Sequence, residues 1–142
     1  MIPNNFTSKS QEAIQNAQQF ASENGQHGVE PIHLLAALAR QEGGFVVTIF
    51  QKMATSLPAL LGDIDRMCDA LPKQGSPDRG GIGQIILTPP LANVLQAAAK
   101  FAKQFGDEYI STEHLLLGLL ADRPINAMLA EHQVAEEAIL SA

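Results

Sequence analysis

The sequence predicts an all-α protein of about eight helices in two pseudo-symmetric tandem repeats. Apolar residues recur at three-to-four spacing in several long segments, which is typical of helices with one buried face. The chain also matches itself when it is shifted along its own length. Glycine, proline and hydroxyl residues separate the periodic segments, and nothing convincingly indicates a sheet.

The self-match has an offset of 81 residues and needs no gap between Thr7 and Leu38. Similar residues also pair at this offset, including Phe6 with Leu87 and Ile14 with Leu95. The identical pairs include Thr7 and Thr88, Ala17 and Ala98, Phe20 and Phe101, Gly25 and Gly106, and His33 and His114. An ungapped match of this length indicates a duplicated unit. The two histidines therefore mark equivalent positions in two copies, instead of one site on which both converge.

The first helix of each repeat carries the same boundary signals. Thr7 and Thr88 are expected N-caps, whose hydroxyls accept an otherwise unpaired amide, and Pro89 and Pro90 suit a first turn. Glycine at the end of each helix accommodates a left-handed residue at little cost. The expected buried stripes are Ala13, Ala17, Phe20 and Ala21 in the first copy, and Leu91, Leu95, Ala98, Ala102 and Phe105 in the second.

The later helices follow shorter turns. The stretches "VEPIHLLAALA" and "YISTEHLLLGLL" predict one helix per repeat, with the histidine early and the leucines in the core. "FVVTIFQKMA" favours a third helix, although its valines and isoleucine also suit a strand, and Ser56 and Pro58 begin a fourth. The expected counterparts in the second half are "INAMLAEH" and "VAEEAILSA".

These elements predict a single domain over residues 1–142. Repeat 1 covers about 6–71, repeat 2 covers about 87–142, and a loop rich in Gly and Pro joins them over 72–86.

Composition excludes several classes of partner. The net charge is −6, the nine Lys and Arg residues are scattered, Trp is absent and Tyr occurs once, so we expect no nucleic-acid partner. No apolar run approaches the ~20 residues that cross a bilayer, so no membrane partner is expected. The start lacks a secretory signal, and the lone Cys68 suits a reducing compartment, which together predict a cytoplasmic protein.

The sequence contains no pattern typical of an active site. Glu113 adjoins His114, but neighbouring residues on a helix do not face each other, and zinc motifs of the HExxH type are absent. No Gly-Lys pair occurs, so the phosphate-binding P-loop is missing. We therefore expect no catalytic residue, no metal and no cofactor in this chain.

Phe20 and Phe101 lie at the edge of their apolar stripes. At this position each aromatic ring could belong to the core, or could line a shallow apolar trough beside small residues such as Ala97. The sequence leaves both alternatives open.

At this point the sequence resembles the double Clp-N domain, the N-terminal module of Hsp100/Clp AAA+ unfoldases, in the version found in ClpB disaggregases. The residues that carry the resemblance are "FT" at 6–7, "VEPIHLLAALARQEGG" at 29–44, "LPK" at 71–73 and "GDEYISTEHLLLGLL" at 106–120. The resemblance implies a module tethered to a hexameric ring that uses ATP. It also implies binding to unfolded or aggregated proteins, with an adaptor or an Hsp70 system as further partners.

The resemblance also implies a peptide-binding region with polar positions at Thr7, Thr88, Asp107 and Glu113. Together with the stripe-edge residues, the candidate set is Thr7, Phe20, Thr88, Ala97, Phe101, Asp107 and Glu113. Helix capping by the threonines and a solvated turn at Asp107 are the competing structural interpretations. Ile32 stands where the second copy has Glu113, so any carboxylate role belongs to one repeat.

Two functions follow from the resemblance. The first is a non-enzymatic substrate-recruitment domain of a ClpB-like disaggregase, which captures hydrophobic segments in a groove and passes them to the AAA+ ring. The alternative is an adaptor-docking domain of a ClpA- or ClpC-type unfoldase that belongs to an ATP-dependent protease. The sequence does not separate a fragment of a larger protein from a stand-alone relative, and it does not identify the clients.

Overall fold

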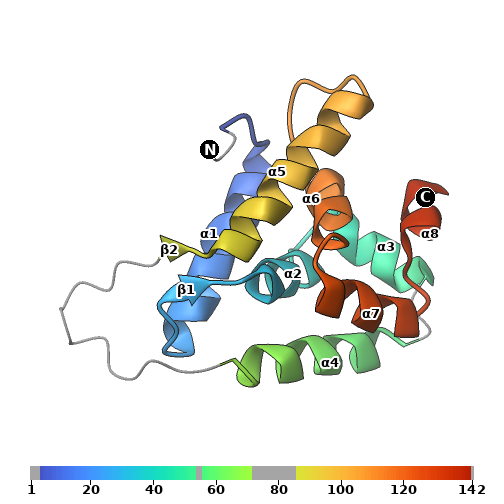
Figure 1. The fold of residues 1–142 in the computed structure, drawn as a ribbon. Coiled ribbons are helices and arrows are strands. Elements are labelled where there is room, and N and C mark those ends of the chain that lie inside the picture. Colours follow the sequence, from blue (N-terminus) through green and yellow to red (C-terminus); the bar gives the residue numbers. More distant parts are fainter. Residues whose placement is uncertain (1–3, 54–55, 72–85, 142) are drawn as a thin grey trace.

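A computed structural model describes residues 4–53, 56–71 and 86–141. These residues form eight helices and two short strands (Figure 1). In order they are α1 (Ser8–Glu23), β1 (Gly28–Val29), α2 (Pro31–Ala39), α3 (Phe45–Met53), α4 (Leu57–Asp69), β2 (Ile86–Leu87), α5 (Pro89–Gln104), α6 (Thr112–Leu119), α7 (Arg123–Glu131) and α8 (Glu136–Ser141). The all-α prediction is confirmed. Of the predicted loop, residues 72–85 lie outside the described residues, and Ile86 belongs to a strand.

The first helices of the two repeats match in length and boundaries. Both α1 and α5 have 16 residues, and each follows a threonine whose hydroxyl accepts a backbone amide, from Ser10 in one copy and from Leu91 in the other. Gly25 and Gly106 follow these helices with φ of 73° and 75°, the left-handed conformation that favours glycine. The capping signals therefore fixed both ends of these helices.

The second helices form the centre of the molecule (Figure 1). Every residue of α2 is buried, and α6 is buried from Thr112 to Leu119 except for Glu113. A helix that is apolar on all sides must be covered on all sides. The first helices, together with α3 and α4, cover these two short helices. One continuous core therefore serves both repeats.

Short backbone pairings next to the first helices join the two repeats. β1 pairs in parallel with β2, which joins Val29 of the first copy to Leu87 of the second, and an isolated parallel bridge joins Phe6 to Ile110. These pairs are equivalent under the 81-residue offset. The segment before each first helix thus pairs with the segment before the other repeat's second helix. The sequence did not predict these strands, since two residues are too few to show a period.

The remaining helices surround this centre. The stretch after Gly44 forms helix α3, which settles the ambiguity with strand, and Ser56 caps α4 by accepting the amide of Ala59 at 3.3 Å. Helix α7 begins at Arg123, two residues before the predicted start, because Asp122 accepts the amide of Ile125. His132 after α7 contacts Asp63 of α4 at 2.7 Å and so joins the two repeats.

Among the described residues, no single helix is long and apolar enough to cross a membrane. Only α3 and α4 taken together pass by length and composition, as a pair bent by 117°.

Candidate functional site

The repeated histidines cap their own helices. His33 Nδ1 accepts the backbone amide of Glu30 at 2.9 Å, and His114 Nδ1 accepts that of Ser111 at 2.9 Å. The amide donor identifies Nδ1 as the acceptor, so Nε2 carries the proton in each neutral ring. This second nitrogen contacts Gln26 Oε1 at 2.7 Å in repeat 1 and Asp107 Oδ2 at 3.0 Å in repeat 2. Gln26 and Asp107 are themselves equivalent under the offset.

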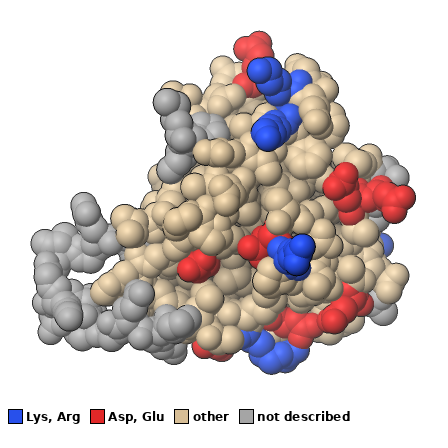
Figure 2. All heavy atoms as spheres, in the orientation of Figure 1, with Lys and Arg blue, Asp and Glu red and all other residues tan. Residues whose placement is uncertain are grey.

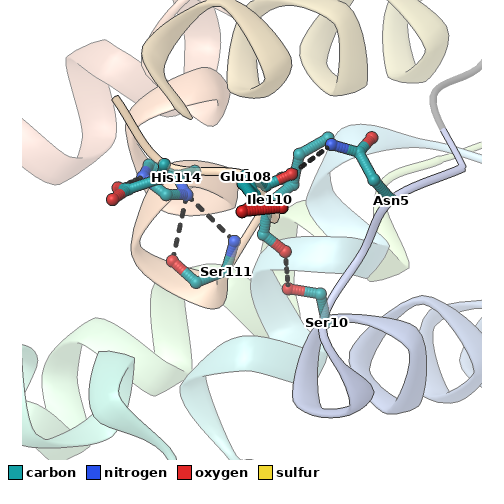
Figure 3. Close-up of polar contacts among 7 residues, drawn as sticks. Asn5, Ser10, Glu108, Ile110, Ser111 and His114 are labelled. Atoms are coloured by element: carbon teal, nitrogen blue, oxygen red, sulfur yellow. Dashed lines mark hydrogen bonds and ion pairs between the residues drawn. The ribbon is translucent and has the colours of Figure 1, made fainter. Parts of the chain in front are cut away.

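The contacts of His114 place a serine, a histidine and an aspartate in one row. Ser111 Oγ lies 3.0 Å from His114 Nδ1 (Figure 3), and Asp107 lies on the opposite side of the ring. A nucleophilic serine would need Nδ1 as its base. That nitrogen has one lone pair, which accepts the backbone amide of Ser111. The row therefore functions as a helix cap.

The lone cysteine has the environment of an unreactive thiol. Cys68 is buried, and this burial, reinforced by the charges of Asp65 and Asp69, raises its pKa to about 11. The thiolate that attacks substrates or binds metals is therefore scarce at neutral pH. Within the described segments no group of three His, Cys, Asp or Glu side chains is placed to hold a metal ion.

Side-chain hydrogen bonds add to both backbone pairings between the repeats. In one copy the hydroxyl of Ser10, which contacts the cap Thr7, donates to the carbonyl of Ile110 at 2.9 Å (Figure 3). In the other copy Thr88 donates directly to the carbonyl of Val29 at 3.0 Å and lies 3.2 Å from Glu30 Oε1. The two predicted threonines therefore cap their helices and also connect one repeat to the other.

An apolar groove lies between α1 and α5. Its volume is about 310 Å³, which is at the lower end of the range for ligand pockets. Phe6, Ile14 and Leu87 are half-buried at its surface, and Leu95 is buried beneath them. Three glutamines of α1 form a neutral edge, namely Gln11, Gln15 and Gln18. None of the described residues that line this groove is charged.

The sequence reasoning left every residue of this groove out of the candidate set. The available signal was the self-match, because Phe6 pairs with Leu87 and Ile14 with Leu95 at the 81-residue offset. Apolar residues that recur in both copies at the margin of a helical stripe can lie in the core of each copy or on its surface. Only the packing of α1 beside α5 shows that these four line one hollow.

The structure divides the predicted site residues between the two ends of the molecule. Thr7 lies against the turn before α6, since its amide donates to the carbonyl of Ile110 at 3.0 Å. That turn carries Asp107, and Glu113 follows at the start of α6. Thr88 occupies the equivalent place at the other end, beside Val29. The polar candidates therefore do not form one cluster.

The two phenylalanines are half-buried in different surroundings. Phe20 lines a surface pocket of about 330 Å³ between α1, α2 and α4, whose other walls include Glu23, Asp69 and the Arg40–Asp65 ion pair. This pocket is more polar than the trough that the helical pattern suggested. Both rings also pack against the core.

Phe101 belongs to an aromatic surface at the end of α5. Its ring centroid is 6.2 Å from that of Phe105, which in turn is 5.8 Å from the imidazole of His114. Phe105 and Tyr109 are 49% and 59% exposed, so two large apolar side chains face solvent beside Asp107. Ala97 lies one turn before Phe101 and is half-buried.

Charge is sparse on the face that carries α1 and α5. Figure 2 shows mostly uncharged side chains over these helices, with basic groups near the C-terminal end of α5 and acidic groups gathered over α7 and α8. A groove with apolar walls and an amide edge can bury hydrophobic side chains without removing a charge from water. This property suits apolar segments better than nucleic acid or phosphate.

Comparison with known proteins identifies relatives over most of the chain. The family described as the Clp repeat (R) N-terminal domain matches residues 5–132. Two relatives carry the name Chaperone protein ClpB. One, from Bacteroides thetaiotaomicron, is 36% identical over 117 residues and covers 82% of this chain. The other, from Bdellovibrio bacteriovorus, is 34% identical over 139 residues and covers 96%. This chain spans only 13% and 16% of the lengths of these two relatives.

Solved structures share the fold. The N-terminal domain of Hsp104 from Candida albicans has a TM-score of 0.82 at 24% identity, over 96% of this chain and 87% of that one. The N-terminal domain of the ClpV1 ATPase from E. coli has a TM-score of 0.77 at 18% identity, over 96% and 82% of the two chains. The match to residues 5–132 and the identities above 30% agree with this fold. The chain therefore belongs to the Clp N-terminal domain family.

Proposed function

We propose that this chain is the substrate-recruitment domain of a ClpB-type disaggregase, and that it captures unfolded or aggregated polypeptide in the groove between α1 and α5. The observation that carries the proposal is the groove itself, whose four apolar side chains lie at or just beneath the surface between two rigid helices. An unfolded segment exposes apolar side chains that gain free energy by entering such a hollow.

Two neighbouring features support the same assignment. The exposed Phe105 and Tyr109 add a second apolar contact at the end of α5, and Asp107, which contacts His114 next to Phe105, supplies a carboxylate beside it. A polypeptide that carries apolar and basic side chains could contact both regions. The domain requires no chemistry of its own for this role, since release to a motor needs only reversible binding.

Weak binding is sufficient for recruitment. In the proposed parent protein, six tethered copies surround one AAA+ ring, and a flexible tether raises the local concentration of each domain. A groove of about 310 Å³ accommodates few side chains, so we expect a dissociation constant in the micromolar-to-millimolar range.

The experiment is an NMR titration of the ¹⁵N-labelled domain with a reduced, unfolded protein such as carboxymethylated lactalbumin. We expect concentration-dependent shifts of the amides of Phe6, Ile14 and Leu87. The variant Ile14→Asn should weaken binding by about tenfold, because a polar group replaces buried apolar surface. Leu140→Asn is the matched control, since Leu140 is 48% exposed on α8 and does not line the groove.

Two outcomes would contradict the proposal. One is a spectrum that stays unchanged at millimolar unfolded protein. The other is equal binding by the Ile14 variant, shown to be folded by its circular dichroism. A pull-down that yields a single folded partner in a 1:1 ratio would instead favour the adaptor-docking alternative.

A further inference from the structure

We propose that the groove between α1 and α5 binds extended polypeptide in both chain directions. This inference rests on the proposed function and concerns how the same groove reads its ligand. Its basis is the local twofold relation between the repeats, which places equivalent residues on opposite sides of the groove.

The lining of the groove consists of two equivalent pairs. Phe6 corresponds to Leu87 and Ile14 to Leu95 under the 81-residue offset, and all four line the same hollow. A hollow lined by both members of two such pairs must straddle the axis that relates the repeats. The exchanged pairs Phe6–Ile110 and Val29–Leu87 obey the same relation, so the axis is a property of the backbone as well as of the side chains.

Rotation about this axis reverses the direction of a bound chain and leaves the apolar surface nearly unchanged. An extended segment can therefore insert its apolar side chains into similar positions in either direction. A sheet edge would behave differently, because parallel and antiparallel pairing give different hydrogen-bond patterns. Here the helices present side chains, and their backbone groups are used within the helices.

The polar edge also accepts either direction. Gln15 and Gln18 carry amide groups that both donate and accept hydrogen bonds, so they match the donors and acceptors of a peptide backbone regardless of its polarity. Gln11 already donates to the carbonyl of Phe6 at 3.0 Å and retains its acceptor oxygen. The described lining residues carry no charge that would distinguish the amino end of a bound peptide from its carboxyl end.

The symmetry is approximate, and its departures set a limit on the effect. Phenylalanine faces leucine in one pair and isoleucine faces leucine in the other, and the three glutamines belong to α1 alone. These differences should bias one direction by no more than about threefold, which corresponds to well under the 1.4 kcal/mol of a tenfold change.

The test uses a 12-residue unstructured peptide with two leucines, prepared with a nitroxide at its N-terminus or at its C-terminus. Each peptide is added to the ¹⁵N-labelled domain, and the paramagnetic broadening of the Phe6 and Leu87 amides is measured. Binding in both directions predicts that the two labels give the same broadening pattern within about threefold. The double variant Phe6→Leu/Ile14→Leu makes the pairs more alike and should bring the two patterns closer together.

Three results are possible. Coincident patterns from the two labels support the inference. If one label broadens mainly Phe6 and the other mainly Leu87, the peptide binds in one preferred direction. That result overturns the inference, while the groove remains a peptide site. Absence of binding by either peptide and by the unfolded protein would remove the proposed function, and this inference with it.

Discussion

The two repeats have the same backbone plan and stabilise it with different side chains. Repeat 1 has Ala13 and Ala37 where repeat 2 has Val94 and Gly118. In repeat 2 the first helix therefore carries the larger side chain and the second helix the smaller one. Repeat 1 pairs its capping histidine with the amide of Gln26, and repeat 2 uses the carboxylate of Asp107. The fold thus requires close packing between the first and second helices and a hydrogen-bond partner for the second nitrogen of the histidine. Different residues can meet both requirements.

The helix contact offers the largest expected effect. A Cβ atom on Gly118 would lie 2.6 Å from the carbonyl oxygen of Val94 and 3.0 Å from the amide nitrogen of Ala98, which are backbone atoms that cannot rotate away. Gly118→Ala should therefore lower the free energy of unfolding by about 2–3 kcal/mol, measured by urea denaturation. The reciprocal change Ala37→Gly should cost about 1 kcal/mol, the usual penalty for glycine within a helix. Equal stability of Gly118→Ala and the wild type would show that α5 and α6 separate easily.

The histidine partners make a prediction about pH. Burial lowers the pKa of His33, whose Nε2 faces the neutral amide of Gln26. The unfolded chain therefore binds a proton more readily near pH 6.5 than the folded one. Stability is complete above that pH and is lost as the pH falls through the folded pKa, by at most about 1.4 kcal/mol per pH unit for one proton.

The measurement is urea denaturation at intervals between pH 7.5 and 5. His33→Gln should be less stable than the wild type at pH 7.5, because the cap of α2 is lost, and its stability should fall less steeply towards pH 5. An identical slope for the variant and the wild type would assign the pH dependence to other groups.

The threonine caps sharpen the comparison at a smaller scale. The backbone amides of both threonines donate to the other repeat, but their hydroxyls differ: that of Thr7 acts through Ser10, whereas that of Thr88 donates directly to the carbonyl of Val29. Thr88→Ala should therefore lower the free energy of unfolding by about 2 kcal/mol and Thr7→Ala by about 1 kcal/mol, each followed by thermal and urea unfolding. The reverse order would mean that the serine contact is the stronger connection between the repeats.

The smallest effect concerns the ends of the helices. Gly25 and Gly106 adopt positive φ, and so does Gln133 after α7, at 68°. Gln133→Gly should raise the free energy of unfolding by about 0.5–1 kcal/mol, because glycine tolerates this conformation without steric strain. Gly106→Ala is the matched opposite. Its Cβ would meet no atom of the described residues within 4 Å, so a loss of about 1 kcal/mol would measure backbone strain alone.

The local chemistry of the chain was sufficient to predict the helices and most of their ends. The caps at Thr7, Thr88 and Ser56 and the left-handed glycines were all predicted, because each depends on residues within one turn. The start of α7 was wrong by two residues, since Asp122 was not recognised as its cap. The sequence placed the histidines early in equivalent helices, and only the structure showed that they cap them.

By itself the sequence determined the repeated helices, the caps of their first helices and most of their buried stripes, because these depend on spacing along one segment. The prediction of Phe105 in the second stripe is wrong, since its side chain is 49% exposed at the end of α5. The tertiary structure alone decided that short backbone pairings join the two repeats and that Gln26 and Asp107 contact the capping histidines. It also decided that one groove is lined by Phe6, Ile14, Leu87 and Leu95. These features join residues that are distant in the chain, and their free energy arises only when separate helices pack together. The self-match named the equivalent residues, and only the local twofold arrangement brought them to opposite sides of a single hollow.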